Sequence, residues 1–252
     1  MVNKLIKVAF FVEGLTETIF IRSLLLNIFD SSKLEIECIR LFNTSKGEPT
    51  YSIFNDLAIM KVLIIDVEGD SKVLSGIKER ENNFFNQSYK KIIGLRDMYS
   101  DEYKNLSKKK GADEKTNSLV ISRTQSEINK MTHPNLIKLH FAIMEIEAWF
   151  LAMTDVLSKV DSRLTPNFIK NKLGFDILII DPQFYFRKPS RDLEKVYALV
   201  GKTYDKTKSC LEGLMSKIQK EDFYNLYSSG KVSHYKNFFE DIKEGLEGYL
   251  IS

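Results

Sequence analysis

The sequence has little of what disulfide-stapled or zinc-stapled proteins depend on. It contains two cysteines in 252 residues, Cys38 and Cys210, which lie far apart and form no C-x-x-C pair. They support neither a disulfide framework nor a zinc site, so we expect a reducing compartment. With only 12 glycines and 5 prolines, the chain is not collagen-like or of low complexity. A chain of this length buries enough surface to fold on its own core.

Long apolar runs and a strong net charge are also missing. The run at residues 8–12 stops at Glu13, whereas a membrane-spanning helix needs about 20 apolar residues. We therefore expect no membrane segment and a cytoplasmic location. Lys and Arg number 37 against 34 Asp and Glu, which leaves a net charge of +3. So small a charge indicates no polyanionic partner by itself, and only local basic clusters bear on nucleic-acid binding.

Short apolar runs alternate with helical patterns over the first 156 residues. Strands are expected over residues 4–12, 34–42, 61–65, 90–95 and 136–144, and helices over residues 16–30, 71–85 and 145–156. The lysine-rich stretch 98–135 is interpreted as an insertion with a helix near 125–131. This order predicts an α/β fold with a mainly parallel sheet flanked by helices.

After residue 156 the pattern becomes helical. Helices are expected at 193–200, 206–218, 222–226 and 235–250, whereas DILII at 176–180 fits either a strand or a buried loop. We therefore predict an α/β domain at residues 1–156 and a smaller, mostly helical C-terminal portion at 157–252 packed on it.

Acidic side chains follow the predicted strands. They are Glu13, Asp66 with Asp70, Asp97 with Asp101, and Glu145 with Glu147. Carboxyl ends of parallel strands meet at one edge of a sheet, and like charges gathered there are costly unless hard cations neutralise them. Oxygen ligands without neighbouring His or Cys favour Mg²⁺ or Mn²⁺. Each acid also has a structural interpretation, as a turn residue or as a first-turn acid favoured by a helix dipole.

The segment FFVEGLTE at residues 10–17 resembles the opening motif of Toprim domains, the fold shared by topoisomerases, bacterial primases and overcoming-lysogenization-defect nucleases. The resemblance implies that Glu13 is a metal-site or acid/base residue and that Asp97 stands in the family's later acidic motif. That motif spaces two aspartates one residue apart, whereas three residues separate Asp97 from Asp101. Only Asp97 is therefore carried over.

More of the chain resembles the Toprim-like family DUF4276, which is found beside ATPases in defence-type loci. The pieces, in order, are VEG at 12–14, EGDSKV at 68–73, LRDMY at 95–99, MEIEAWF at 144–150, KPSR at 188–191 and YDK at 204–206. That family looks like a set of metal-dependent nucleases. The resemblance implies an effector of a bacterial antiviral defence system that works with an ATPase partner.

Carboxylate-held Mg²⁺ or Mn²⁺ fits phosphodiester hydrolysis, in which a nearby Lys or Arg neutralises developing charge. We expect a metal-dependent nuclease acting on DNA or RNA. The expected metal ligands are Glu13, Glu17, Asp97, Glu145 and Glu147, and the expected catalytic residues are Glu13, Asp97, Glu147 and Lys206.

Two basic windows are candidates for holding the nucleic-acid backbone. Residues 104–115 carry five lysines, among them Lys108 and Lys109. Residues 187–208 carry seven basic and three acidic residues, including Lys188 and Arg191, with Tyr197 and Tyr204 between them. Such windows are also common on solvated loops and helix faces. We expect nucleic-acid contacts from Lys188, Arg191, Lys108 and Lys109.

Two other functions remain open. The chain could be a non-catalytic Toprim-like binding or regulatory module of an ATPase complex, or a different phosphoryl-transfer enzyme such as a primase-like polymerase or a phosphatase. The choice of DNA or RNA, the number of ions and homodimer formation are also open.

Overall fold

The computed structural model describes residues 5–41, 47–69, 71–107 and 112–250. The chain forms two compact units. The first, called the sheet unit here, comprises Met1–Arg96, Ser118–Phe141 and Glu240–Ser252, and the second, the helical unit, comprises Asp97–Asn117 and Ala142–Phe239. The units interleave along the sequence, whereas the predicted division is a single cut after residue 156, which stays a prediction.

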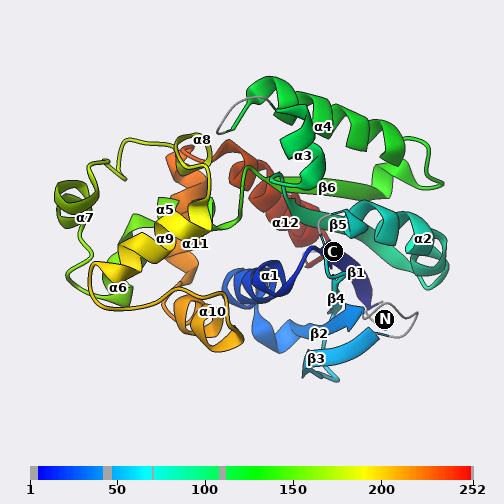
Figure 1. Cartoon of the computed structure of the whole chain (residues 1–252). Coiled ribbons are helices and arrows are strands. Elements are labelled where there is room, and N and C mark those ends of the chain that lie inside the picture. The colour runs from blue at the N-terminus through cyan, green and yellow to red at the C-terminus, as the bar shows by residue number, and fades with distance from the viewer. Residues whose placement is uncertain (1–4, 42–46, 70, 108–111, 251–252) are drawn as a thin grey trace. The chain divides into compact units, whose positions relative to one another are not determined.

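Six strands form the sheet, in the order β3-β2-β4-β1-β5-β6 (Figure 1). Their bounds are Ile6–Val12 for β1, Leu34–Leu41 for β2, Gly47–Ile53 for β3, Met60–Asp66 for β4, Tyr89–Asp97 for β5 and Ile137–Ala142 for β6. β1 pairs in parallel with β4 and β5, β2 pairs in parallel with β4, and β2 pairs antiparallel with β3. The predicted α/β class with a mainly parallel sheet is confirmed.

Two helices join parallel strands of the sheet. α1 (Leu15–Ile28) leads from β1 to β2, and α2 (Lys72–Asn86) leads from β4 to β5. The strand order makes these two connections run in opposite directions along the sheet. Since such crossovers are right-handed, α1 and α2 cover opposite faces.

The α2 face carries a closed apolar core. Phe11 of β1 contributes to it and packs edge-on against Phe84 of α2, with ring centroids 5.6 Å apart. Ile128, the last residue of α4 (Glu114–Ile128), belongs to the same cluster. The alternation in β1 places Phe11 on this face, and Phe10, also fully buried, on the other.

β3 was not predicted from the sequence. Its seven residues, GEPTYSI, are mostly exposed or half-buried, because the strand lies at the sheet edge and pairs only with β2. Edge strands need no continuous apolar run and tolerate a residue such as Pro49. The apolar pattern that reveals the central strands is therefore absent here.

Short helices make up the helical unit. They are α3 (Asp101–Leu106), α5 (Glu147–Ala152), α6 (Thr154–Val160), α7 (Pro166–Leu173), α8 (Pro182–Tyr185), α9 (Pro189–Ala198), α10 (Lys208–Met215) and α11 (Lys220–Ser229), with α12 (Ser233–Leu250) beginning in it. Trp149 is fully buried, with the rings of Tyr235 and Phe238 at 5.2 and 5.6 Å. Among the described residues, no helix is both long and apolar enough to cross a membrane.

The DILII segment at 176–180 is a turn, not a strand. The Asp176 carbonyl accepts from the N–H groups of Ile179 and Ile180, and its carboxylate accepts from Leu178 N–H. Leu178 and Ile179 are 58% and 78% exposed. The aspartate therefore closes a turn that directs Leu178 and Ile179 outward, whereas Ile177 stays fully buried.

An ion-pair cluster holds α12 at Asp241, in the part of the helix that belongs to the sheet unit. Asp241 Oδ2 lies 3.0 Å from His140 Nε2 of β6, and Asp241 Oδ1 lies 3.5 Å from Lys91 Nζ of β5. The nearby His140 side chain, aided by the charges of Lys91 and Lys138, lowers the Asp241 pKa to about 2. The ionised carboxylate therefore stabilises the folded chain.

We expect Asp241→Asn to lower the free energy of unfolding at pH 6. The loss is at most about 2 kcal/mol. A carboxylate whose pKa is lower in the folded state stabilises the fold above its unfolded-state pKa near 3.9, and this contribution is lost as pH falls through its folded-state pKa. The difference from wild type should shrink between about pH 4 and pH 2. Urea unfolding of both proteins at several pH values measures it, and a pH-independent difference would contradict this explanation.

Candidate functional site

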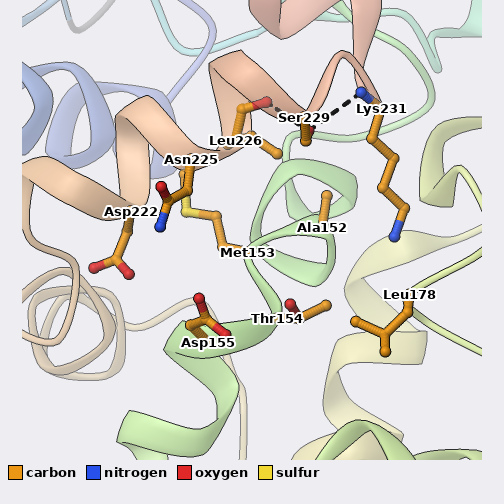
Figure 2. A pocket seen from close by; sticks show the side chains of 10 residues that line it. All are labelled: Ala152, Met153, Thr154, Asp155, Leu178, Asp222, Asn225, Leu226, Ser229 and Lys231. Carbon is orange, nitrogen blue, oxygen red and sulfur yellow. Dashed lines mark hydrogen bonds between the residues drawn. The ribbon is translucent and has the colours of Figure 1, made fainter.

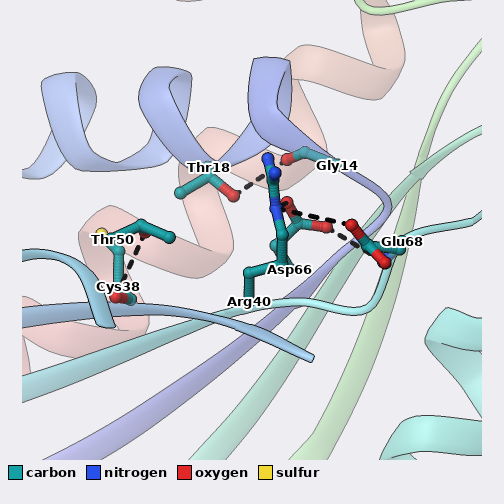
Figure 3. A network of polar contacts seen from close by, with 7 residues as sticks. All are labelled: Gly14, Thr18, Cys38, Arg40, Thr50, Asp66 and Glu68. Atoms are coloured by element: carbon teal, nitrogen blue, oxygen red, sulfur yellow. Dashed lines mark hydrogen bonds and ion pairs between the residues drawn. The ribbon is translucent and has the colours of Figure 1, made fainter. Parts of the chain in front are cut away.

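In the sheet unit, Asp66 is the last residue of β4, and each of its carboxylate oxygens accepts a hydrogen bond. Asp66, which is 3% exposed, accepts from Glu68 N–H at 2.9 Å and from Arg40 Nε at 3.0 Å (Figure 3). Burial raises the Asp66 pKa, while these two hydrogen bonds oppose the rise. Glu68 has a φ of 52° and so lies in a tight turn. The Asp66 carboxylate holds this turn by accepting from Glu68 N–H, which favours the structural interpretation of Asp66.

Glu13 lies at the same strand ends. It follows β1 directly, and its carbonyl accepts from Gly69 N–H at 2.9 Å, which ties the end of β1 to the turn after β4. Val12 pairs with Asp66 on one side and with Leu95 on the other, so β1, β4 and β5 end at one edge of the sheet. Glu13 therefore lies at this edge of the sheet, and its role as a metal ligand stays a prediction.

Glu17 is buried in the first turn of α1, with 4% exposure. Its carboxylate lies close to Gly14, since a Cβ atom added to Gly14 would be 3.6 Å from Glu17 Oε2. Asp70, the second acid of this turn in the sequence, lies outside the described residues.

In the helical unit, Glu147 is the centre of a buried polar cluster. It opens α5, is fully buried, and its Oε1 accepts from Tyr204 Oη and from Lys206 Nζ, each at 2.8 Å. Its Oε2 has no hydrogen-bond partner among the described residues. A buried carboxylate oxygen without a donor is costly unless something else compensates it.

Lys206 provides the positive charge of this cluster. Burial of the ammonium opposes its charge, but Glu147 outweighs that effect and Asp97 and Glu145 add to it, so the Lys206 pKa is raised above its ordinary value. Lys206 therefore stays protonated. The Lys206 side chain is 41% exposed, so its ammonium also lies within reach of solvent.

Tyr204 donates a hydrogen bond to Glu147 from the buried side of the cluster. It is 4% exposed, and burial together with the Glu147 charge raises its pKa far above the ordinary value. The hydroxyl therefore stays protonated and can only donate to the carboxylate. This arrangement fixes the orientation of Glu147 while Lys206 approaches from the exposed side.

Two other predicted acids of the helical unit accept backbone hydrogen bonds. Asp97 Oδ1 accepts from Ile146 N–H at 2.8 Å, and Glu145 Oε2 accepts from Ser190 N–H, in the first turn of α9, at 2.8 Å. Asp97 therefore holds the loop before α5, and Glu145 joins that loop to α9. Both negative charges act on Lys206. The helical unit therefore places Glu147 against Lys206, and the charges of Asp97 and Glu145 also act on Lys206. The role of these acids as metal ligands stays a prediction.

The loops that carry the cluster contain strained backbone. Met144 has a φ of 63° and Lys206 a φ of 57°, the left-handed region that non-glycine residues rarely adopt. Thr207 N–H donates to Asp205 Oδ1 at 3.0 Å, which supports the turn around Lys206. Strain of this kind gathers at functional sites, since side chains held there can be aimed at a ligand.

The predicted nucleic-acid contacts have mixed positions. Arg191 is exposed on the first turn of α9 and Lys188 is its half-buried N-cap residue, whereas Lys108 and Lys109 lie outside the described residues. Tyr197 and Tyr204 are 5% and 4% exposed. The idea that these two tyrosines lie along a surface track is therefore wrong, because their rings pack inward against each other.

The metal-ligand prediction can be checked against the donors present. Among the described residues, no group of three or more His, Cys, Asp or Glu is arranged to hold a metal ion. Mg²⁺, however, is often held through one or two carboxylates plus water and substrate phosphates. Glu147 Oε2 is buried and accepts no hydrogen bond from the described residues, so it fits such a partial set of metal ligands, with Asp97 and Glu145 acting on the same cluster.

A pocket of about 180 Å³ in the helical unit is separate from these acids. It is lined by Ala152, Met153, Thr154, Asp155, Leu178, Asp222, Asn225, Leu226, Ser229 and Lys231. Figure 2 shows Lys231 extending along one wall toward Leu178, and its ammonium donates to the Ile177 carbonyl. None of the predicted site residues lines it.

Sequence reasoning missed two partners of the cluster. Tyr204 was considered only as a surface aromatic, and Ser190 was given no role. Both lie in the short motifs YDK and KPSR that carry the family resemblance. Those motifs were the available signal, since each partner lies 45 or more residues from the acid it contacts.

The chain matches no protein-family model, no curated protein and no solved structure. The resemblance to Toprim domains therefore stays a prediction.

Proposed function

We propose that the chain is a nuclease that hydrolyses phosphodiester bonds with Mg²⁺ or Mn²⁺. The observation that carries the proposal is Glu147: a fully buried carboxylate with one oxygen held by Tyr204 and Lys206 and the other without a hydrogen bond from the described residues. Asp97 and Glu145 add negative charge to the same cluster. Such a cluster suits a divalent cation that a phosphate also binds.

The side chains have separate roles in this proposal. Glu147 would hold the ion through its Oε2, with Asp97 or Glu145 as a second carboxylate, and the bound ion would polarise the phosphate and lower the pKa of a water. Lys206 neutralises negative charge that develops on the phosphate, because it stays protonated and remains 41% exposed. Tyr204 keeps Glu147 oriented. Glu13 and Glu17 stay proposed ligands on the basis of the strand-end pattern and the family resemblance.

A broad cleavage assay tests the proposal. The purified chain is incubated with plasmid, single-stranded DNA and total RNA, with Mn²⁺, with Mg²⁺ and with EDTA. We expect oligonucleotide products only with a divalent ion. Inorganic phosphate or extended primers as the products would instead identify another phosphoryl-transfer enzyme, and cleavage unaffected by EDTA would contradict the metal requirement.

One observation favours a second candidate function. Lys206 already supplies Glu147 with a positive charge. In a Toprim-like site of this kind, the lysine ammonium would compensate the buried carboxylate in place of a metal ion. The chain would then be the non-catalytic module of an ATPase complex. Co-elution with an ATPase encoded beside it, together with no Mn²⁺ binding, would favour this function. The role as a defence effector is a further part of our proposal, and it requires both the ATPase partner and cleavage.

A further inference from the structure

The helical unit exposes apolar and aromatic side chains on one short segment. Leu178, Ile179, Phe184 and Tyr185, called the 178–185 patch here, are 58%, 78%, 39% and 56% exposed. Scattered exposed apolar residues need no explanation, but several exposed apolar side chains on one short segment are a candidate contact surface.

The aromatic part of this patch has a firm base. The Tyr185 ring meets Phe186 edge-on at 5.0 Å and lies 6.0 Å from Phe175, and both of these rings are buried. The fully buried Gln183, one residue before Phe184, accepts from Trp149 Nε1 at 3.2 Å. The Tyr185 ring is thus held before a ligand arrives, which lowers the entropy cost of binding.

The segment that carries the patch has an excess of positive charge. Residues 166–191 contain five basic residues, Lys170, Lys172, Arg187, Lys188 and Arg191, against two acidic ones, Asp176 and Asp181. Both acids are used within the segment, since Asp176 pairs with Lys170 at 2.9 Å and Asp181 accepts from Gln183 N–H. Exposed rings flanked by Arg and Lys suit a polyanion that also has flat apolar faces.

The patch also lies close in the chain to the carboxylate cluster. Ser190, five residues after Tyr185, donates to Glu145. Five residues span at most about 18 Å, a distance that a few nucleotides of a single strand cover. A strand held on Tyr185 is therefore within a few nucleotides of the acids. This continuity, together with the charge, favours a nucleic acid over a protein partner.

We infer that the 178–185 patch binds single-stranded nucleic acid, with bases stacked on Tyr185 and Phe184 and phosphates bound by Arg187 and Arg191. The inference rests on the proposed nuclease function and names its substrate class. Bases inside a duplex have their faces covered by neighbours, so an aromatic platform selects unpaired strands or ends.

Fluorescence anisotropy in EDTA tests this binding without cleavage. The probes are a labelled 20-nucleotide DNA strand, the same sequence in RNA, and a blunt DNA duplex. We expect the wild type to bind both single strands more tightly than the duplex. Tyr185→Ala should weaken single-strand binding about 5- to 150-fold, the range for losing one stacked base, whereas Tyr185→Trp should retain it.

Phe184→Ala is a second test in case Tyr185→Ala disturbs its neighbours, and Phe54→Ala is the matched control. Phe54 is 75% exposed but belongs to the sheet unit, so its loss should leave binding unchanged. Wild-type affinity in both Phe184→Ala and Tyr185→Ala would overturn the inference, as would tighter duplex binding or a change only in self-association. If the wild type cleaves nucleic acid nonetheless, the proposed function stands while this inference falls.

Discussion

Replacing Glu147 by Gln should reduce metal-dependent cleavage by about 100- to 1,000-fold, the cost of losing one group that stabilises transition-state charge. Gln keeps the size of the side chain and an oxygen that can accept from Tyr204 Oη, which donates to Glu147 Oε1 at 2.8 Å. Only the negative charge is lost. The measurement is the initial rate of oligonucleotide release with Mn²⁺ at saturating substrate.

Glu194→Gln is the matched control for this change. Glu194 is an exposed acid on α9 of the same unit, so its replacement removes the same charge without touching the cluster. We expect its cleavage rate to remain within a factor of two of wild type, as estimated from the small effect of surface substitutions. Equal rates for Glu147→Gln and Glu194→Gln would remove Glu147 from the proposed chemistry.

Replacing Lys206 by Met should destabilise the helical unit by about 2 to 4 kcal/mol. The substitution leaves the fully buried Glu147 without its cation, and breaking a buried pair from one side costs about 3 to 5 kcal/mol. We expect somewhat less here, because the Lys206 side chain is 41% exposed and water can partly replace it. Trp149 is the only tryptophan and lies in this unit, so its fluorescence in urea reports the change.

The control for Lys206→Met is Lys195→Met. Lys195 pairs with Asp192 at 2.6 Å and is 64% exposed, so its loss should cost about 1 kcal/mol or less. The double variant Glu147→Gln with Lys206→Met should recover most of the stability, because no uncompensated buried charge remains. A double variant whose loss equals the sum of the two single losses would show that the pair is not coupled.

The central strands were predictable because they are buried on both faces. The runs around Phe10, Ile64 and Ile93 stand out from the polar residues that flank them, and all three residues are fully buried. β3 lacks this signal because its outer edge is exposed. The segment after Asp176 carries a similar signal but forms a turn, because capping by one carboxylate decides its conformation.

The sequence predicts the acids of the candidate cluster and Lys206, but not Tyr204 or Ser190. Strand ends and the family resemblance identify Asp97, Glu145 and Glu147, and the structure brings all three into one cluster with Lys206. The role of Tyr204 depends on a contact across 57 residues of sequence. Periodicity carries no information about such long-range contacts, and the motifs YDK and KPSR mark the partners without showing which acid each one contacts.

The most direct test asks whether Glu147, with Asp97 and Glu145 in the same unit, takes up a divalent cation. Calorimetric titration of the purified chain with Mn²⁺, beside Asp97→Asn and Glu147→Gln, measures this directly. We expect the wild type to bind Mn²⁺ with a dissociation constant of about 1 mM or tighter, so that 10 mM Mn²⁺ adds about 1.4 kcal/mol of stability, and both variants to bind more weakly. No binding by the wild type, or equal binding by all three proteins, would contradict the account.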